Sequence, residues 1–182
     1  IGQLEKDTQK AMNYYRKAIE QGYEEAREWM EQLQKNLVDE TITDIEIPQD
    51  KSDEELYKDA KNALEKAQFK TAYAYFSYLT QRNHAESFNE LGDMYFYGRG
   101  MAINQAKALE LYKKAAALDS VYGFFNVGFL YWNGPEEIQD PEQALQYLKK
   151  AVQMGYTYAL SFIGDIYRTG PEELIDYAEA KR

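Results

Sequence analysis

The sequence predicts an all-α protein built from stacked helix pairs, an α-solenoid. The main observation is an internal period, because residues of the same kind return every 36 positions. A repeat of this length holds two helices, and such a pair buries both of its apolar faces only when the next pair stacks on it. A second observation is that β-strand signals are absent. The recurring positions are Gly92, Gly128 and Gly164; Ala72, Ala108, Ala144 and Ala180; and Asn104, Asp140 and Asp176.

Residues 121–133, VYGFFNVGFLYWN, have the length of a helix but almost no polar face. A helix that is apolar nearly all round is covered on two sides. We therefore expect one stripe to pack inside the solenoid and another element to lie on the second stripe. The first stripe consists of Phe124, Val127, Gly128 and Tyr131, and the second of Tyr122, Phe125, Phe129 and Trp132.

Each repeat is expected to contain a first helix, such as 85–97, 121–133 or 157–169, and a second helix. Glycines recur in the middle of the first helices, where we expect them to let a neighbouring helix approach closely. The first helices should end at Gly98, Gly134 and Gly170, in the left-handed conformation that closes many helices. The second helices should begin after a capping side chain, at Asp7, Asn104, Asp140 and Asp176, with Pro141 in a first turn.

The motif of these repeats resembles the Sel-one-like repeat, a relative of the tetratricopeptide repeat. The resemblance rests on ELGDMYFYGRG (90–100) followed by ALELYKKAAA (108–117), and on FIGDIYRTG (162–170). Residues 54–76 have the shorter tetratricopeptide spacing. The resemblance implies a right-handed α/α superhelix that serves as an adaptor or scaffold and carries no catalysis.

Three regions follow from the repeat pattern. Residues 1–35 form a partial repeat, with a loop at 1–7, a second-type helix at 8–21 and a first-type helix at 23–33. Residues 36–52 form an acidic linker, and residues 53–182 hold helical repeats of period about 36, the last one truncated.

The linker region is strongly charged, since residues 36–55 carry eight acidic side chains against one lysine. It also contains Ile42, Ile45 and Ile47, which a purely solvated linker does not need. Two interpretations stay open: a solvated linker with incidental isoleucines, or an extended segment that packs on the molecule's own surface.

Both ends of the chain fall within a repeat, and we expect the chain to be a piece of a longer solenoid. The alternative is self-association, in which helix 8–21 of one molecule stacks on helix 157–169 of the next. The first residue is Ile1 and the sequence has no cysteine, so the compartment of this soluble chain stays open between the cytoplasm and the periplasm or exterior.

The composition argues against an enzyme and against a cofactor or metal site. His84 is the sole histidine and cysteine is absent, so the usual zinc ligand sets and nucleophile–histidine pairs cannot form. The net charge of −10, without a basic cluster, disfavours nucleic acid as a partner. No apolar run approaches the roughly 18–20 residues of a membrane span.

The remaining function class is protein or peptide binding. In the arrangement that the resemblance implies, the first helices line a concave groove with an aromatic centre and carboxylates beside it. We expect a peptide with apolar anchors and basic flanks, met by Glu86, Asp93 and Asp165. The alternative is that curvature buries these side chains as ordinary core. The candidate binding residues are Tyr57, Asn89, Asp93, Phe96, Tyr97, Tyr122, Phe125, Phe129, Trp132, Tyr158, Asp165 and Arg168.

Overall fold

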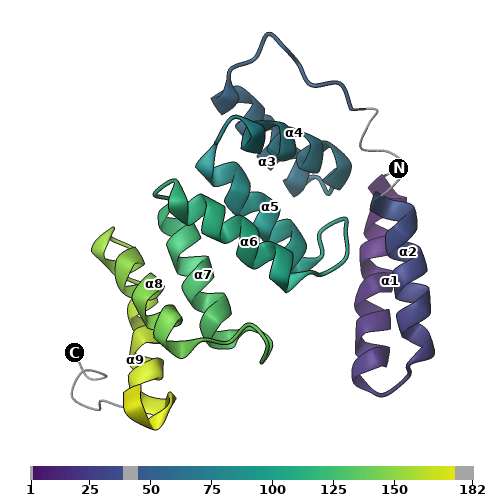
Figure 1. The fold of residues 1–182 in the computed structure, drawn as a ribbon. Helices are drawn as coiled ribbons and strands as arrows, with labels where there is room; N and C mark the ends of the chain where they lie inside the picture. Colours follow the sequence, from purple (N-terminus) through teal and green to yellow (C-terminus); the bar gives the residue numbers. More distant parts are fainter. Residues whose placement is uncertain (1, 39–44, 175–182) are drawn as a thin grey trace. The chain divides into compact units, whose positions relative to one another are not determined.

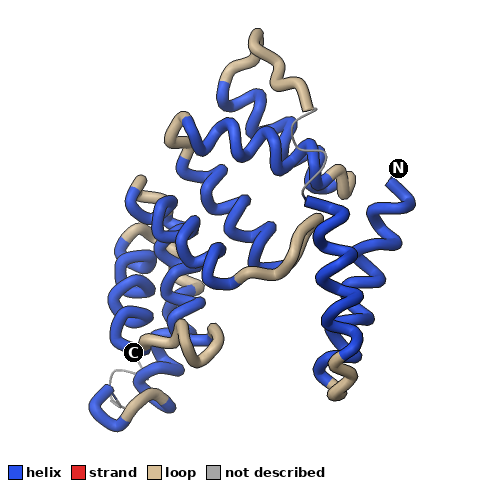
Figure 2. Tube along the Cα trace, turned by 45° about the vertical axis from the view of Figure 1, so that its right-hand side comes forward, coloured by secondary structure: helices blue, strands red, loops and turns tan. Residues whose placement is uncertain are grey.

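The computed structural model of the chain describes residues 2–38 and 45–174. Throughout these two ranges the regular elements are helices and no strand occurs, which confirms the all-α prediction (Figures 1 and 2). In this described part, no helix is both long and apolar enough to cross a bilayer. The elements are α1 (Gly2–Glu20), α2 (Glu25–Val38), α3 (Asp53–Glu65), α4 (Phe69–Gln81), α5 (Ala85–Tyr97), α6 (Gln105–Ala117), α7 (Val121–Asn133), α8 (Pro141–Gln153), α9 (Ala159–Thr169) and the short 3-10 helix η2 (Glu172–Leu174).

The chain divides into two compact units, Ile1–Asn104 and Gln105–Arg182. In the first unit α1 packs against α2, while α3, α4 and α5 pack in succession. In the second unit α6, α7, α8 and α9 pack in succession. Consecutive antiparallel packing of this kind is what stacked helix pairs require.

Each unit has its own apolar core. The largest fully buried side chains of the first unit include Leu56, Phe76, Leu79 and Met94. Those of the second unit are Val127, Leu130, Leu148 and Ile166. In the first stripe of α7, Val127 and Gly128 are buried as predicted, whereas Phe124 and Tyr131 are only half-buried.

The predicted starts of the second helices agree with the structure at two positions. The carboxylate of Asp140 accepts a hydrogen bond of 3.0 Å from the backbone N–H of Gln143, and Pro141 is the first residue of α8. α6 begins directly after Asn104. Asp176 lies outside the described residues.

The prediction for the N-terminus is wrong. Residues 1–7 were expected to be a loop capped at Asp7, but α1 starts at Gly2 and runs through Asp7. The segment Gln3–Lys6 consists of good helix formers without proline or a β-branched residue, so nothing in it stops the helix. α2 also continues past the predicted residue 33, to Val38.

The glycines that end the first helices behave differently from one another. Gly98 adopts the predicted left-handed conformation, with φ of 66°. The prediction is wrong at Gly134 and Gly170, whose backbones are extended. A proline follows each of these two glycines and restricts its backbone to extended conformations. A Cβ there would also lie 2.4 Å from the carbonyl oxygen of Leu130 or Ile166, which explains why glycine is needed.

The turns after the second helices have a period of their own. Asn83 and Asp119 are non-glycine residues with positive φ, 58° and 59°, and Gly155 has φ of 97°. These three positions are 36 residues apart, so the same left-handed turn follows α4, α6 and α8. Asn, Asp and Gly are the residues that tolerate this conformation best.

The close helix approach predicted for the central glycines is present at Gly128. A Cβ at Gly128 would lie 2.7 Å from Cγ of the buried Leu148 and 3.1 Å from the carbonyl oxygen of Ala144. The backbone of α7 therefore packs directly on α8.

The described end of the acidic segment is partly packed. Ile45, Ile47 and Pro48 are half-buried, while Glu46 and Asp50 are exposed. At these positions the structure favours packing on the molecule's own surface. Ile42 lies outside the described residues.

Candidate functional site

An aromatic surface covers one side of α7 and continues onto α9. It consists of Tyr122, Phe125, Phe129, Tyr156, Tyr158 and Phe162. The first three residues belong to the second stripe of α7, Tyr156 and Tyr158 lie in the turn before α9, and Phe162 lies on α9. The six aromatic residues thus come from two helices, α7 and α9, and from the turn that joins α8 to α9.

Phe125 is the centre of this aromatic surface. Its ring centroid lies 4.8 Å from that of Tyr156, 5.5 Å from Phe162, 5.7 Å from Tyr158 and 6.1 Å from Phe129. Most of the ring pairs in the cluster are tilted or edge-on, the arrangements that aromatic quadrupoles favour. The cluster is therefore an ordered network rather than a loose group of rings.

None of the six rings is fully buried. Tyr122 is 55% exposed and Tyr158 is 62% exposed, whereas Phe125, Phe129 and Phe162 are half-buried. Phe125 and Phe162 also pack against the core of Ala144, Leu148, Ala151, Ala159, Ile163 and Ile166. The aromatic surface thus rests on the core of its unit and keeps an accessible outer side.

Trp132, the last residue of the second stripe, is the next to the last residue of α7. It is half-buried and packs against that same core. It contributes more to packing than Tyr122 or Tyr158 does.

Two charged candidates, Asp165 and Arg168, pair with each other on α9. Nη2 of Arg168 lies 2.6 Å from Oδ1 of Asp165, one turn apart, and both side chains are substantially exposed. The pair reduces the net charge that Asp165 presents to a partner.

In the first unit, Tyr57 takes part in a partly buried polar network between α3 and α5. Its hydroxyl donates to Oε1 of Glu90 at 3.2 Å, and Nζ of Lys61 donates to the same oxygen at 2.6 Å. Burial raises the pKa of the Tyr57 phenol well above its ordinary value, and the charge of Glu90 adds to this. The ring also lies 4.9 Å from that of His84 and 5.9 Å from that of Phe76.

The other candidates of the first unit lie on α5 and differ in accessibility. Asn89 is only 8% exposed, so little of it is available to a partner, while Asp93 is half-buried. Tyr97 is 51% exposed and its ring lies 4.8 Å from that of Phe96 and 5.0 Å from the guanidinium of Arg99.

Sequence reasoning missed Tyr156 and Phe162, and the signal that could have found them is a departure from the repeat. The positions equivalent to Tyr156 in the two preceding repeats are His84 and Ser120, whose side chains cap α5 and α7. A tyrosine cannot cap in this way, so α9 starts at Ala159 rather than at the predicted 157, without a side-chain cap. At the position equivalent to Phe162, the two preceding repeats have Glu90 and Asn126.

The described residues offer no arrangement for metal binding. No group of three or more His, Asp or Glu side chains converges within them. His84 has a structural role, since its Nδ1 accepts a hydrogen bond of 3.3 Å from the backbone N–H of Ser87.

The solved structures similar to this chain share its fold. A crystal structure of a Sel1 repeat protein from Oxalobacter formigenes has a TM-score of 0.56 and 18% identity, and the match covers 97% of this chain and 77% of that chain. The protein c5321, a protective antigen of uropathogenic Escherichia coli strains displaying an SLR fold, has a TM-score of 0.61 and 16% identity. That match covers 97% of this chain but 36% of the antigen chain, so this chain spans about a third of its length.

At the level of sequence, no curated protein matches the chain. The family model of the Sel1 repeat matches residues 1–23, 85–120 and 125–156, which together make up half of the chain. The matched segments contain Gly92, Gly128, Ala108, Ala144, Asn104 and Asp140 of the 36-residue period. The chain therefore belongs to the Sel1 repeat family.

Proposed function

We propose that this chain is a protein-interaction scaffold whose aromatic surface on α7 and α9 anchors a peptide segment of a partner. Sel1 repeat proteins generally mediate protein–protein interaction, and the family is generally non-enzymatic. The observation that carries the proposal is the set of six contacting aromatic rings, all of which keep part of their surface accessible.

Accessible aromatic clusters on a rigid base suit the anchoring of apolar side chains. Tyrosine and phenylalanine supply large contact areas and lose little conformational entropy on binding. Because the rings already pack against each other and on the core, the surface is preorganised, which reduces the entropic penalty of binding. The partner would present apolar anchors to Phe125 and Phe129.

Within the unit that holds the aromatic surface, the basic flank expected of the peptide would meet Asp165. Arg168 partly neutralises Asp165. We therefore infer that the apolar anchors provide most of the affinity and that basic flanks add selectivity.

The proposal is tested with a random peptide library selected on the full chain. Selected peptides should carry aromatic or aliphatic anchors, and their affinity should fall by about 10-fold or more in the triple variant Tyr122→Ser/Phe129→Ala/Tyr158→Ser, the size of effect typical of interface hot spots. The matched control, Tyr14→Ser/Tyr23→Ser, removes two exposed tyrosines of the other unit and should bind normally.

Two results would contradict this assignment. One is selection of peptides whose binding the triple variant leaves unchanged. The other concerns Phe125→Ala, which should weaken binding while keeping a cooperative melting transition. Loss of that transition would mean that the aromatic stripe acts as core.

A second candidate function is self-assembly through the N-terminal helix pair, favoured by three exposed aromatic side chains on it. Tyr14, Tyr23 and Trp29 are 62%, 66% and 55% exposed. Such residues can stack on a further helix of another copy. Sedimentation velocity at rising concentration should show a growing mass that Tyr14→Ser/Trp29→Ser abolishes. A strictly monomeric chain excludes this function.

A further inference from the structure

The side of α7 that faces α8 carries a second aromatic group, surrounded by lysines. Phe124 and Tyr131 lie on α7, about 100° round the helix from Phe125. Their ring centroids lie 6.1 Å and 6.0 Å from that of Tyr147 on α8. Nζ of Lys150 lies 5.9 Å from the Phe124 ring, and Nζ of Lys113 lies 5.0 Å from the Tyr131 ring. We call these five residues the lysine–aromatic face.

This face is hollowed beside Phe124. The hollow has a volume of about 260 Å³ and is lined by Phe124, Gln143, Gln146, Tyr147 and Lys150. Its size is below the roughly 300–1,000 Å³ of pockets for drug-sized molecules. A single large side chain of a partner fits this volume better than a whole small-molecule ligand does.

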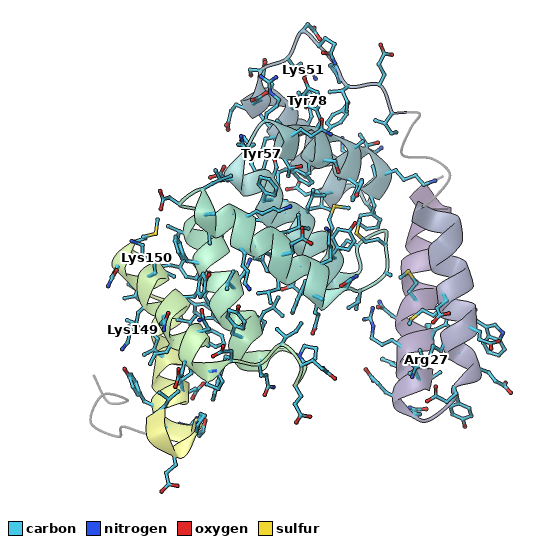
Figure 3. The ribbon with its side chains drawn as sticks, viewed as in Figure 1. Arg27, Lys51, Tyr57, Tyr78, Lys149 and Lys150 are labelled. Carbon is cyan, nitrogen blue, oxygen red and sulfur yellow. The ribbon has the colours of Figure 1, made fainter. Side chains whose placement is uncertain are left out.

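The charge of the face is opposite to that of the chain. The chain has a net charge of −10, yet Lys150 borders the hollow and Lys113 lies over the neighbouring ring. Within the described residues, Lys107 and Lys114 of α6 form ion pairs with Glu110. Lys113 takes no part in these two ion pairs. A lysine held over a ring keeps donors for a carboxylate. Figure 3 shows Lys150 on α8.

We propose that the lysine–aromatic face docks an acidic peptide segment whose apolar anchor side chain enters the hollow. The anchor packs between the rings of Phe124 and Tyr147, and the amides of Gln143 and Gln146 hydrogen-bond to the main chain of the peptide. Carboxylates beside the anchor pair with Lys150 and Lys113. This docking site uses different residues from the aromatic surface and prefers the opposite charge in its partner.

Fluorescence anisotropy with a labelled peptide tests the proposal. The probe has a central leucine–phenylalanine pair between glutamates, and its counterparts carry lysines in place of the glutamates or alanines in place of the central pair. The acidic probe should bind saturably to the full chain and more weakly as salt is added. Both counterparts should bind at least about 10-fold more weakly.

A charge-reversal pair separates this face from general electrostatics. Lys113→Glu/Lys150→Glu should weaken the binding of the acidic probe by about 10-fold or more. The control Lys107→Glu/Lys114→Glu makes the same change in net charge on the exposed side of α6 and should weaken it far less. Both variants should keep a cooperative melting transition, because the four lysines are partly or largely exposed and the pairs of Lys107 and Lys114 with Glu110 lie at the surface.

Three outcomes overturn the proposal: no saturable binding of the acidic probe, equal binding of the lysine counterpart, or equal loss in the two double variants. The triple variant Tyr122→Ser/Phe129→Ala/Tyr158→Ser keeps the lysine–aromatic face and should bind the acidic probe normally. Loss of binding in that variant would place the probe on the aromatic surface instead.

Discussion

The ammonium of Lys61 lies 2.6 Å from Oε1 of Glu90 and thereby links α3 to α5, the first helices of two neighbouring pairs. The hydroxyl of Tyr57 donates to the same oxygen. The side chain of Glu90 is only 11% exposed, so its carboxylate depends on these two donors. A buried carboxylate with two partners contributes to stability mainly because losing either side leaves polar groups without a bond.

We predict that Glu90→Gln destabilises the chain by about 1–2 kcal/mol, since the amide keeps one acceptor but loses the charge. The measurement is the midpoint of urea unfolding. Glu110→Gln is the matched control, because Glu110 also pairs with two lysines but is largely exposed, and it should change stability by less than about 0.5 kcal/mol. Equal effects of the two substitutions would mean that the network is no stronger than a surface ion pair.

The same network makes stability depend on alkaline pH. Burial raises the pKa of the Tyr57 phenol above the ordinary tyrosine value of about 10, with a further contribution from Glu90. Above this ordinary value the unfolded chain releases the phenol proton while the folded chain keeps it, so stability falls as pH rises. The contribution is fully present below pH of about 10.

Tyr57→Phe should therefore make the loss of stability above about pH 10 shallower. Urea midpoints measured in steps from neutral to alkaline pH provide the comparison. Tyr14→Phe removes an exposed phenol and serves as the control. If both variants follow the parent chain at high pH, the folded state does not retain the Tyr57 proton.

Much of the fold could be predicted from the sequence because its signals are local and repeated. The predicted ranges 85–97 and 121–133 coincide with α5 and α7 residue for residue. Asp140 was identified as a cap, and Gly128 as a point of close approach, from chemistry that needs no knowledge of distant contacts.

The rest depends on contacts that the repeat pattern does not encode. Gly134 and Gly170 looked like Gly98, but the prolines that follow them select a different conformation. The sequence could show that another element must pack on the second stripe of α7. Among the residues that contact this stripe are Tyr156 and Phe162, and their placement follows from the start of α9 at Ala159 instead of residue 157. Whether a stripe residue is packed or accessible depends on such neighbours, so Trp132 and Tyr122 differ although they share one stripe.

The close contact of Gly128 with Leu148 predicts the effect of adding a methyl group. Alanine is favoured over glycine by about 1 kcal/mol inside a helix. Here its Cβ would press on Leu148 and on the carbonyl oxygen of Ala144, an overpacking that costs about 1–3 kcal/mol. We expect Gly128→Ala to lower stability by about 1–2 kcal/mol net, as measured by urea unfolding. Gln146→Ala, at an exposed position of α8, is the control. If Gly128→Ala instead stabilised the chain, α7 and α8 would be able to move apart freely.

The Asp140 cap predicts a pair of unequal substitutions. Asp140→Ala removes the acceptor of the Gln143 N–H and should reduce stability by about 1 kcal/mol. Asp140→Asn keeps a side-chain oxygen at the same place and should change stability by a few tenths of a kcal/mol, roughly. Unfolding midpoints near pH 7 compare the two. Equal destabilisation by both would attribute the effect to the charge at the helix start instead of the hydrogen bond.

The two tryptophans predict a difference in fluorescence that tests how the α7 stripe is covered. Trp132 is half-buried against the core of its unit, whereas Trp29 is 55% exposed. The emission of Trp132 is measured in a Trp29→Phe chain, and that of Trp29 in a Trp132→Phe chain. The emission maximum of Trp132 should therefore lie at a shorter wavelength than that of Trp29. Because the cover of Trp132 comes from this core, deletion of residues 36–52 should leave its emission unchanged. A red shift on deletion would instead show that the acidic segment covers the stripe, and the α7 surface would then be one that the chain itself can close.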